Sequence, residues 1–280
     1  MTARRLPGPM LLLAPAIAML GLLFIAPLFW FFINVFSREK SVTDLAERFV
    51  EVLTSRPVMT ALVTTNWICL LVTAVALVVG YPIAYYMANR TGWRFALVLF
   101  CIIVPYFTSV IVRTYSWMVL LGRNGIINQA LQSIGLIDVP VPLLYNKLGI
   151  VIGMTYVLLP YMILALYAAM RGIDPSLTRA AFGLGASRIY TFWRIYLPLS
   201  LHGVISGSLI VFILAIGFFL TPALMGGPGD VMIAMLIERS VEITLDWTTA
   251  AIMSIVLLVV TLALYGIYYR LTDVRQMMGA

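Results

Sequence analysis

The sequence predicts an all-α integral membrane protein with six membrane-spanning helices. Hydrophobic residues make up 62% of the 280 residues and charged residues only 10%, and the mean hydropathy is +1.04. A soluble domain has about half apolar and about a quarter charged residues. The apolar residues also fall into six separate runs, each long enough for the helix of about 20 residues that crosses a bilayer. These observations exclude an ordinary soluble domain.

The six runs give the expected spans in chain order. They lie at roughly 10–36, 59–87, 95–121, 148–170, 203–225 and 249–270. Prolines inside them, such as Pro82 and Pro160, are compatible with a bundle, because neighbouring helices can satisfy the backbone groups that a proline leaves free. The first run follows Arg4 and Arg5 and is longer than the roughly 7–15 apolar residues of a signal peptide. We therefore expect it to remain as the first span.

The segments between the runs predict the domain organisation and the orientation. We expect an N-terminal helix with an outer loop at 1–58, a transmembrane core at 59–270 and a tail at 271–280. Lys and Arg are more frequent on the side of both termini, where Asp174 and Asp273 are the only acids. Because cytoplasmic loops carry an excess of Lys and Arg, both termini and residues 171–202 are expected to face the cytoplasm. Residues 37–58, on the other side, are expected to form an amphipathic helix.

Residues 171–202 place a basic, glycine-broken segment between two apolar runs. Asp174 and Pro175 predict a helix start, since Asp is a good N-cap and proline is tolerated at the first helical position. One helix face has apolar residues at i, i+3, i+4 and i+7, namely Leu177, Ala180, Ala181 and Leu184. Gly183 and Gly185 are expected to end this helix, and Gly185 to allow a tight turn.

A second short helix is expected directly after this turn. It repeats the same apolar spacing with Ile189, Phe192, Trp193 and Tyr196. Pro198 is expected to stop it before the next span begins. The spacing alone suits either a hairpin lying among lipid headgroups or a docking surface for another protein.

The stretch "AA…LGAS…TFWRIYLPLS" resembles the cytoplasmic EAA loop of permease subunits in binding-protein-dependent type I ABC importers. The matching positions are Ala180, Ala181, Gly185, Ile195, Leu197 and Pro198, with Ala186 beside them. The resemblance covers about residues 59–270. Arg179 departs from the family pattern, because the family has glutamate at this position. "PALMGGPGDVMI" and "SVIVRTYSWMVLLGRNGIIN" are similar to the spermidine/putrescine branch, and permeases for other small amines and amino-acid-like solutes share them.

The resemblance implies a multi-pass protein of the bacterial inner membrane that moves a polyamine by alternating access. It implies four kinds of partner: a second permease, two ATP-binding subunits, a solute-binding protein outside the membrane and the lipid bilayer itself. The loop at 179–198 would dock on the ATP-binding subunit, which would hold ATP and Mg. The chain has no P-loop, since neither Lys40 nor Lys147 stands in G-x-x-x-x-G-K-[ST]. We therefore expect no enzymatic activity, cofactor, metal or nucleic acid on this chain.

Polar and aromatic residues in the runs give a candidate solute path. They are Asn66, Tyr106, Thr108, Arg113, Tyr115, Trp117, Tyr161 and Thr221. Arg113 lies about 27 Å into a straight third span, so its side chain either extends to the outer interface or faces the path. Asn66 suits a hydrogen bond to another helix, and Gly203 and Gly207 suit close helix packing. Cys69 and Cys101 are expected to pack as small core residues.

Two other classes of protein remain as alternatives. An ion-coupled secondary transporter usually needs acids or histidines at membrane depth, and none of the eleven acids falls clearly within a run. A membrane-embedded enzyme needs a nucleophile–base pair or a metal cluster, and His202 is the only histidine. The outer acids Asp230, Glu238, Glu242 and Asp246 suit contact with a binding protein, attraction of a cationic solute, or simple solvation.

Overall fold

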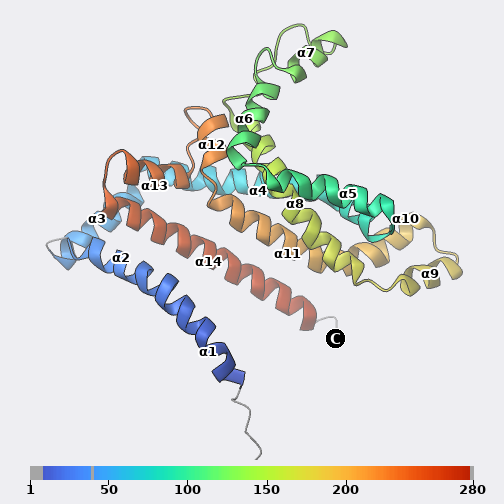
Figure 1. Cartoon of the computed structure of the whole chain (residues 1–280), viewed down its shortest axis with the longest axis horizontal. Helices are drawn as coiled ribbons and strands as arrows, with labels where there is room; N and C mark the ends of the chain where they lie inside the picture. Colours follow the sequence, from blue (N-terminus) through green and yellow to red (C-terminus); the bar gives the residue numbers. More distant parts are fainter. Residues whose placement is uncertain (1–8, 39–40, 278–280) are drawn as a thin grey trace, which may run out of the picture.

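The computed structural model describes residues 9–38 and 41–277, and this part of the chain is helical with no strand. It contains five helices long and apolar enough to cross a membrane, and a bent helix pair makes a sixth candidate. Figure 1 shows the long helices running broadly along one direction, with α9 and α10 at one end and α3 and α13 near the other. The predicted all-α membrane class is confirmed.

Three helices form the centre of the bundle: α4 (Arg56–Ala88), α8 (Lys147–Arg171) and α11 (Leu197–Ile216). Their contacts bury apolar side chains completely, among them Met162 on α8 and Val211 on α11. Both α4 and α8 continue through an internal proline, Pro82 and Pro160 respectively. The expectation that the bundle tolerates these prolines is therefore confirmed.

Close packing of α11 on α8 depends on two glycines. A Cβ atom at Gly203 would lie 2.6 Å from the Cβ of Ala169, and one at Gly207 would lie 2.9 Å from the sulfur of Met162. Real Cβ atoms essentially never approach this closely, so any larger residue would push the two helices apart. The predicted role of this glycine pair in helix packing is confirmed.

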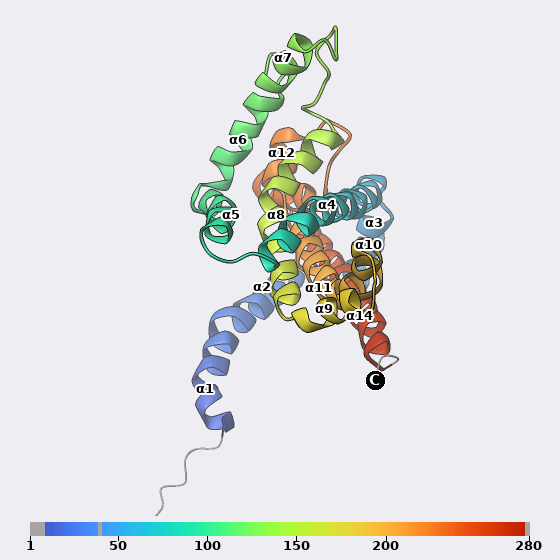
Figure 2. The same cartoon turned by 90° about the vertical axis from the view of Figure 1, so that its right-hand side faces the viewer.

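A second set of helices surrounds the start of α14 (Trp247–Met277). It consists of α2 (Ala26–Phe36), α3 (Val42–Thr54) and α13 (Ile233–Glu242). A small apolar cluster that includes Val52, Ile233 and Ile252 holds these helices to α4 and α14. The amphipathic helix expected within residues 37–58 is α3. The N-terminal helix α1 (Pro9–Leu20) runs through the π-helical turn η1 (Gly21–Ile25) into α2 and projects away from the bundle (Figures 1 and 2).

The third span is bent, so the expectation of one straight helix over 95–121 is wrong. α5 (Trp93–Ile103) and the 3₁₀ turn η2 (Val104–Phe107) meet α6 (Val110–Leu121) at an angle of 104°. Pro105 opens the 3₁₀ turn, and Thr108 has extended backbone angles of φ −93° and ψ 146°. The Thr108 hydroxyl donates to the carbonyl of Pro105 at 2.7 Å, which stabilises the break. Figure 2 shows α6 continuing to α7 (Ile126–Ser133) away from the bundle.

Cys101 on α5 is exposed, whereas Cys69 on α4 is buried. The prediction of two core cysteines therefore holds only for Cys69. The reason is that α5 buries no residue completely against the rest of the chain.

The fifth span begins earlier and ends earlier than expected. A continuous helix runs from α10 (Arg188–Thr191) through the π-helical turn η3 (Phe192–Tyr196) into α11, and α12 (Leu220–Met225) is separate. The expectation that Pro198 stops the short helix is wrong. Leu197 donates its N–H to the carbonyl of Phe192, five residues back, and Pro198 then occupies the first turn of α11. A proline in this position needs no N–H donor of its own, so the helix continues.

Candidate functional site

The first part of the candidate site is the elbow formed by α9 (Pro175–Gly183) and α10. The carboxylate of Asp174 accepts a hydrogen bond from the N–H of Ser176 at 2.8 Å, and Pro175 follows it at the first helical position. These hydrogen bonds from Ser176 hold the pKa of Asp174 below its ordinary value, and the charge of Arg179 lowers it further. The predicted helix start is confirmed.

The first helix of the elbow ends in a left-handed turn at Gly185. Its φ is +83°. The N–H of Gly185 donates to the carbonyl of Phe182, and the N–H of Ala186 donates to the carbonyl of Ala181, both at 3.0 Å. This pair of bonds is a Schellman motif, which satisfies carbonyls at a helix end. A Cβ at Gly185 would meet nothing within 4 Å, so the glycine is needed for its backbone angle and not for lack of space.

A groove of about 640 Å³ lies between the two arms of the elbow. Its walls are formed by Leu177, Ala180, Ala181, Leu184, Gly185, Ala186, Ser187, Tyr190 and Ile195. The apolar face predicted for the first helix therefore faces this groove. Of the other residues assigned to the loop, Arg179, Leu197 and Pro198 lie outside it.

The apolar face predicted for the second helix divides into two. Phe192 and Tyr196 point into the bundle, where the ring of Tyr196 lies 4.8 Å from that of Tyr85 between centroids. Trp193 is 61% exposed, and Ile189 is exposed beside it. The division follows from the π-helical turn, because its i→i+5 bonding places residues at angles that the 3.6-residue period does not predict.

Four aromatic side chains, Tyr81, Tyr85, Phe192 and Tyr196, form what we call the aromatic bracket. Phe192 stands edge-on to Tyr81 and Tyr85 at centroid distances of 6.0 and 5.8 Å. The bracket joins α4 to the turn η3, where the elbow meets α11. The bracket thus connects the elbow to two helices of the bundle.

The second part of the candidate site is a pair of adjacent cavities, which we call the Arg113 cavities. The first has a volume of about 380 Å³ and is lined by Tyr106, Thr108, Ser109, Val110, Arg113, Val157, Leu158, Tyr161, Leu214 and Phe218. The second has a volume of about 310 Å³ and is lined by Thr108, Val112, Arg113, Ser116, Trp117, Leu120 and Tyr156. Both are made by the bend between α5 and α6 where it faces α8.

Arg113 lines both cavities and has few partners of its own. Its side chain is only 9% exposed, and its Nε atom has no hydrogen-bond partner among the described residues. The guanidinium carbon lies 6.0 Å from the ring centroid of Tyr106. The side chain therefore faces the cavities. The expected distance of about 27 Å from the start of a straight third span does not apply to Arg113, because this residue lies just after the bend.

The structure brings together five of the eight candidate path residues at these cavities: Tyr106, Thr108, Arg113, Trp117 and Tyr161. Tyr115 instead lines a separate cavity of about 800 Å³ beside the outer segment 140–145. Thr221 is buried, with its hydroxyl 3.3 Å from that of Thr114, and ties α12 to α6. The sequence reasoning missed Tyr156, whose ring lies 5.4 Å from that of Trp117. The signal that could have identified it is a tyrosine within a predicted span.

Asn66 does not bond to another helix, so that expectation is wrong. Its side-chain amide donates to the carbonyl of Leu62 in the same helix at 2.8 Å. The neighbouring Thr65 makes the interhelical bond instead, because its hydroxyl accepts from the N–H of Ile233 at 2.9 Å. One position along the helix changes which face a side chain occupies.

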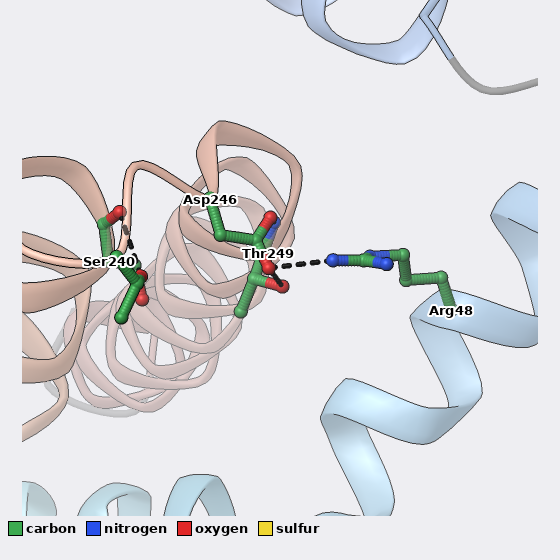
Figure 3. A network of polar contacts seen from close by, with 5 residues as sticks. Arg48, Ser240, Asp246 and Thr249 are labelled. Atoms are coloured by element: carbon green, nitrogen blue, oxygen red, sulfur yellow. Dashed lines mark hydrogen bonds and ion pairs between the residues drawn. The ribbon is translucent and has the colours of Figure 1, made fainter.

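Two of the four acids Asp230, Glu238, Glu242 and Asp246 form hydrogen bonds within the chain. Asp246 accepts from Arg48 at 2.6 Å and from the hydroxyl of Thr249 at 2.7 Å, as Figure 3 shows. Asp230 accepts from the backbone N–H of Gly227 at 3.2 Å. Among the described residues, no three His, Cys, Asp or Glu side chains are grouped closely enough to hold a metal ion.

Comparisons with known proteins agree with this arrangement. Residues 80–274 match the family described as binding-protein-dependent transport system inner membrane component. The spermidine/putrescine transport system permease protein PotB of Escherichia coli K12 is 36% identical over 201 residues, which cover 72% of this chain and 73% of that protein. PotB of Haemophilus influenzae is 35% identical over 198 residues, covering 71% and 69%.

A solved structure shares the fold. It is the bacterial alginate ABC transporter in complex with an alginate pentasaccharide-bound periplasmic protein, one chain of which aligns with a TM-score of 0.69 at 19% identity over 92% of this chain and 91% of its own. The family match and the PotB relatives together cover most of the bundle described above. The chain therefore belongs to the inner membrane components of binding-protein-dependent transport systems, and is a permease subunit of an ABC importer.

Proposed function

We propose that this permease moves a polyamine, putrescine or spermidine, into the cell. The observation that carries the proposal is the 36% identity to a spermidine/putrescine permease over 72% of the chain. The aromatic lining of the Arg113 cavities supports it, because aromatic faces attract ammonium groups.

The proposed assembly contains this chain, a second permease, two ATP-binding subunits and an external solute-binding protein. ATP and Mg would bind to the ATP-binding subunits, because this chain has no P-loop sequence. Both termini and the elbow would lie on the cytoplasmic side, which the distribution of Lys and Arg supports. The elbow groove, about 640 Å³ between two short helices, would contact the ATP-binding subunit there.

Transport would proceed by alternating access. The binding protein would deliver the solute to the outward-open bundle, and ATP-driven movement of the ATP-binding subunits would displace the elbow. The aromatic bracket would pass that displacement to α4 and α11, which would close the outer side and open the inner side. Arg179 replaces the glutamate of the family pattern, so either the ATP-binding subunit would carry a compensating acid or the glutamate would not be essential in this complex.

A second candidate solute is a small molecule that carries a carboxylate, such as an amino-acid-like compound. The observation that favours it is the buried cation Arg113 in the proposed path. A guanidinium binds a carboxylate strongly and repels an ammonium group.

ATP hydrolysis by the complete complex in proteoliposomes tests both candidates. The complex would be given its binding protein with putrescine, with spermidine or with 4-aminobutyrate. We expect stimulation by the two polyamines alone. Stimulation by 4-aminobutyrate alone would replace the polyamine by the second candidate, and hydrolysis that no loaded binding protein stimulates would contradict both.

A further inference from the structure

Arg113 is a buried cation that forms no ion pair with any residue of the described part of the chain. Its side chain is 9% exposed, and its Nε atom has no hydrogen-bond partner among the described residues. The candidate spans of the described chain contain no Asp or Glu at all. Burying an unpaired charge is costly, so such a group is normally paired or hydrogen-bonded.

The lining of the cavities does not supply the missing charge. The polar groups beside Arg113 are hydroxyls, of Thr108, Ser109 and Ser116, together with the phenols of tyrosines. Hydroxyls accept hydrogen bonds but do not neutralise a cation. A guanidinium presents a planar set of donors that matches the two oxygens of a carboxylate.

The proposed solute cannot supply the charge either. Putrescine and spermidine are cations, and like charges in a site of low dielectric constant repel each other. This step rests on the proposed function. A polyamine can occupy the Arg113 cavities only if another group first neutralises the guanidinium.

We propose that Arg113 binds a carboxylate of an aspartate or glutamate on the second permease subunit. Next to the cavities, α6 presents an exposed apolar face with Val112, Tyr115 and Val119. This face suits packing against an apolar helix of the partner, and Arg113 gives the contact its charge complementarity. The ion pair leaves the aromatic rings of the cavities, among them Tyr106, Trp117, Tyr156 and Tyr161, free to hold an ammonium group.

Charge reversal in the assembled importer tests the pair. The complex of both permeases and the ATP-binding subunits would be purified with Arg113→Gln, Arg113→Lys or Arg113→Glu, and its melting temperature measured without solute. Arg123→Gln, which removes an exposed arginine of the outer segment, is the matched control. We expect a lower melting temperature for Arg113→Gln, a still lower one for Arg113→Glu, and no change for the control.

The partner residue is then identified by rescue. Each Asp and Glu in the predicted spans of the second permease would be changed to Arg in the Arg113→Glu background. We expect one of these reversals to restore the melting temperature of the complex to the wild-type value. The proposal would be overturned if Arg113→Gln melted at the wild-type temperature, or if no reversal restored the melting temperature. The Arg113→Gln measurement decides even if Arg113→Glu does not assemble.

The source of the carboxylate is tested separately with 4-aminobutyrate. If this probe stabilises the wild-type complex but not Arg113→Gln, the solute supplies the carboxylate and the second permease does not. The proposed polyamine function can fail independently, because the melting and rescue measurements contain no solute. Absence of putrescine uptake together with successful charge reversal would reject the polyamine and retain the ion pair.

Discussion

The hydroxyl groups of Tyr81 and Ser200 lie 2.8 Å apart and join α4 to α11 beside the aromatic bracket. Ser200 also donates to the carbonyl of Leu197 at 2.9 Å, within the first turn of α11. The polar link and the edge-on contact of Tyr81 with Phe192 therefore hold the same junction. At this junction the elbow leaves the bundle.

Tyr85→Ala is expected to weaken the coupling between hydrolysis and uptake. The change removes the contacts of Tyr85 with Phe192 and Tyr196, which have centroid distances of 5.8 and 4.8 Å. Aromatic pairs contribute about 0.5–1.5 kcal/mol each beyond their buried area, so uptake per ATP hydrolysed should fall by up to about tenfold. Both rates would be measured in the same proteoliposomes. Tyr86→Ala, at the exposed neighbouring position, is the control, and an equal effect there would reject the bracket.

Gly185→Ala is expected to strain the elbow without any clash. A left-handed backbone costs a residue with a Cβ about 1 kcal/mol or more, and φ at this position is +83°. Uptake should fall moderately while membrane insertion is retained, and Gly183→Ala, which has neither positive φ nor close neighbours, should change little. Gly185→Glu adds bulk and charge at the groove and should uncouple hydrolysis from uptake. Wild-type uptake by Gly185→Glu would rule out docking at the elbow.

Gly203→Ala is expected to destabilise the contact between α8 and α11. The added Cβ would lie 2.6 Å from the Cβ of Ala169, and overpacking of this kind costs about 1–3 kcal/mol. The melting temperature of the complex should drop. Ala169→Gly should restore it in the double variant, and Gly217→Ala, where a Cβ meets nothing within 4 Å, should have no such effect. A double variant that melts as low as Gly203→Ala would show that the two residues do not compete for space.

Asp246→Asn is expected to lower stability at neutral pH and to have no effect in acid. Partial burial raises the pKa of Asp246, but hydrogen bonds from Thr249 and the charge of Arg48 outweigh it, so the pKa lies below the ordinary value of 3.8. A carboxyl with a lowered pKa stabilises the fold above its unfolded pKa and loses this effect as pH falls through the folded pKa.

The expected loss for Asp246→Asn is modest, because a partly exposed pair of this kind contributes about 0.2–1 kcal/mol. Melting curves from pH 7 to below about pH 4 would show the two proteins converging as the carboxylate is protonated. Arg48→Gln should reproduce the neutral-pH loss. If the melting temperatures of the wild type and Asp246→Asn differed as much in acid as at neutral pH, the effect would come from the hydrogen bonds of Asp246 at the start of α14 and not from its charge.

The sequence predicts those parts of the structure that local chemistry determines. Asp174 and Pro175 favour a helix start through their local chemistry, and Gly185 adopts a left-handed turn because its backbone allows it. The bend at Thr108 was missed because Pro105 is equally compatible with a straight helix in a bundle, as Pro82 and Pro160 demonstrate. Tertiary contacts decide whether the helix bends or stays straight, and the spacing of apolar residues in the sequence does not reveal these contacts.

The candidate site shows the same limit. Arg113, Tyr106 and Tyr161 were found because charged side chains and side chains with a polar group are less common in an apolar run. Asn66 was assigned the bond that Thr65 makes, since hydropathy does not determine the rotation of α4. A related limit applies to Phe192 and Trp193, which were predicted to share one face. The prediction assumed 3.6 residues per turn throughout, and the π-helical turn η3 changes the angles between the side chains.

The continuous helix from Arg188 to Ile216 connects the elbow to the Arg113 cavities. At 1.5 Å per residue, its 29 residues span about 43 Å. Gly203 and Gly207, which allow it to pack closely on α8, lie near its midpoint, and in the proposed mechanism the helix would tilt about this contact. A tilt of about 5° moves each end by about 2 Å in opposite directions. Leu214 lies near the end of the helix away from the elbow and lines the first cavity, so in the proposed mechanism a displacement of the elbow would change the width of that cavity.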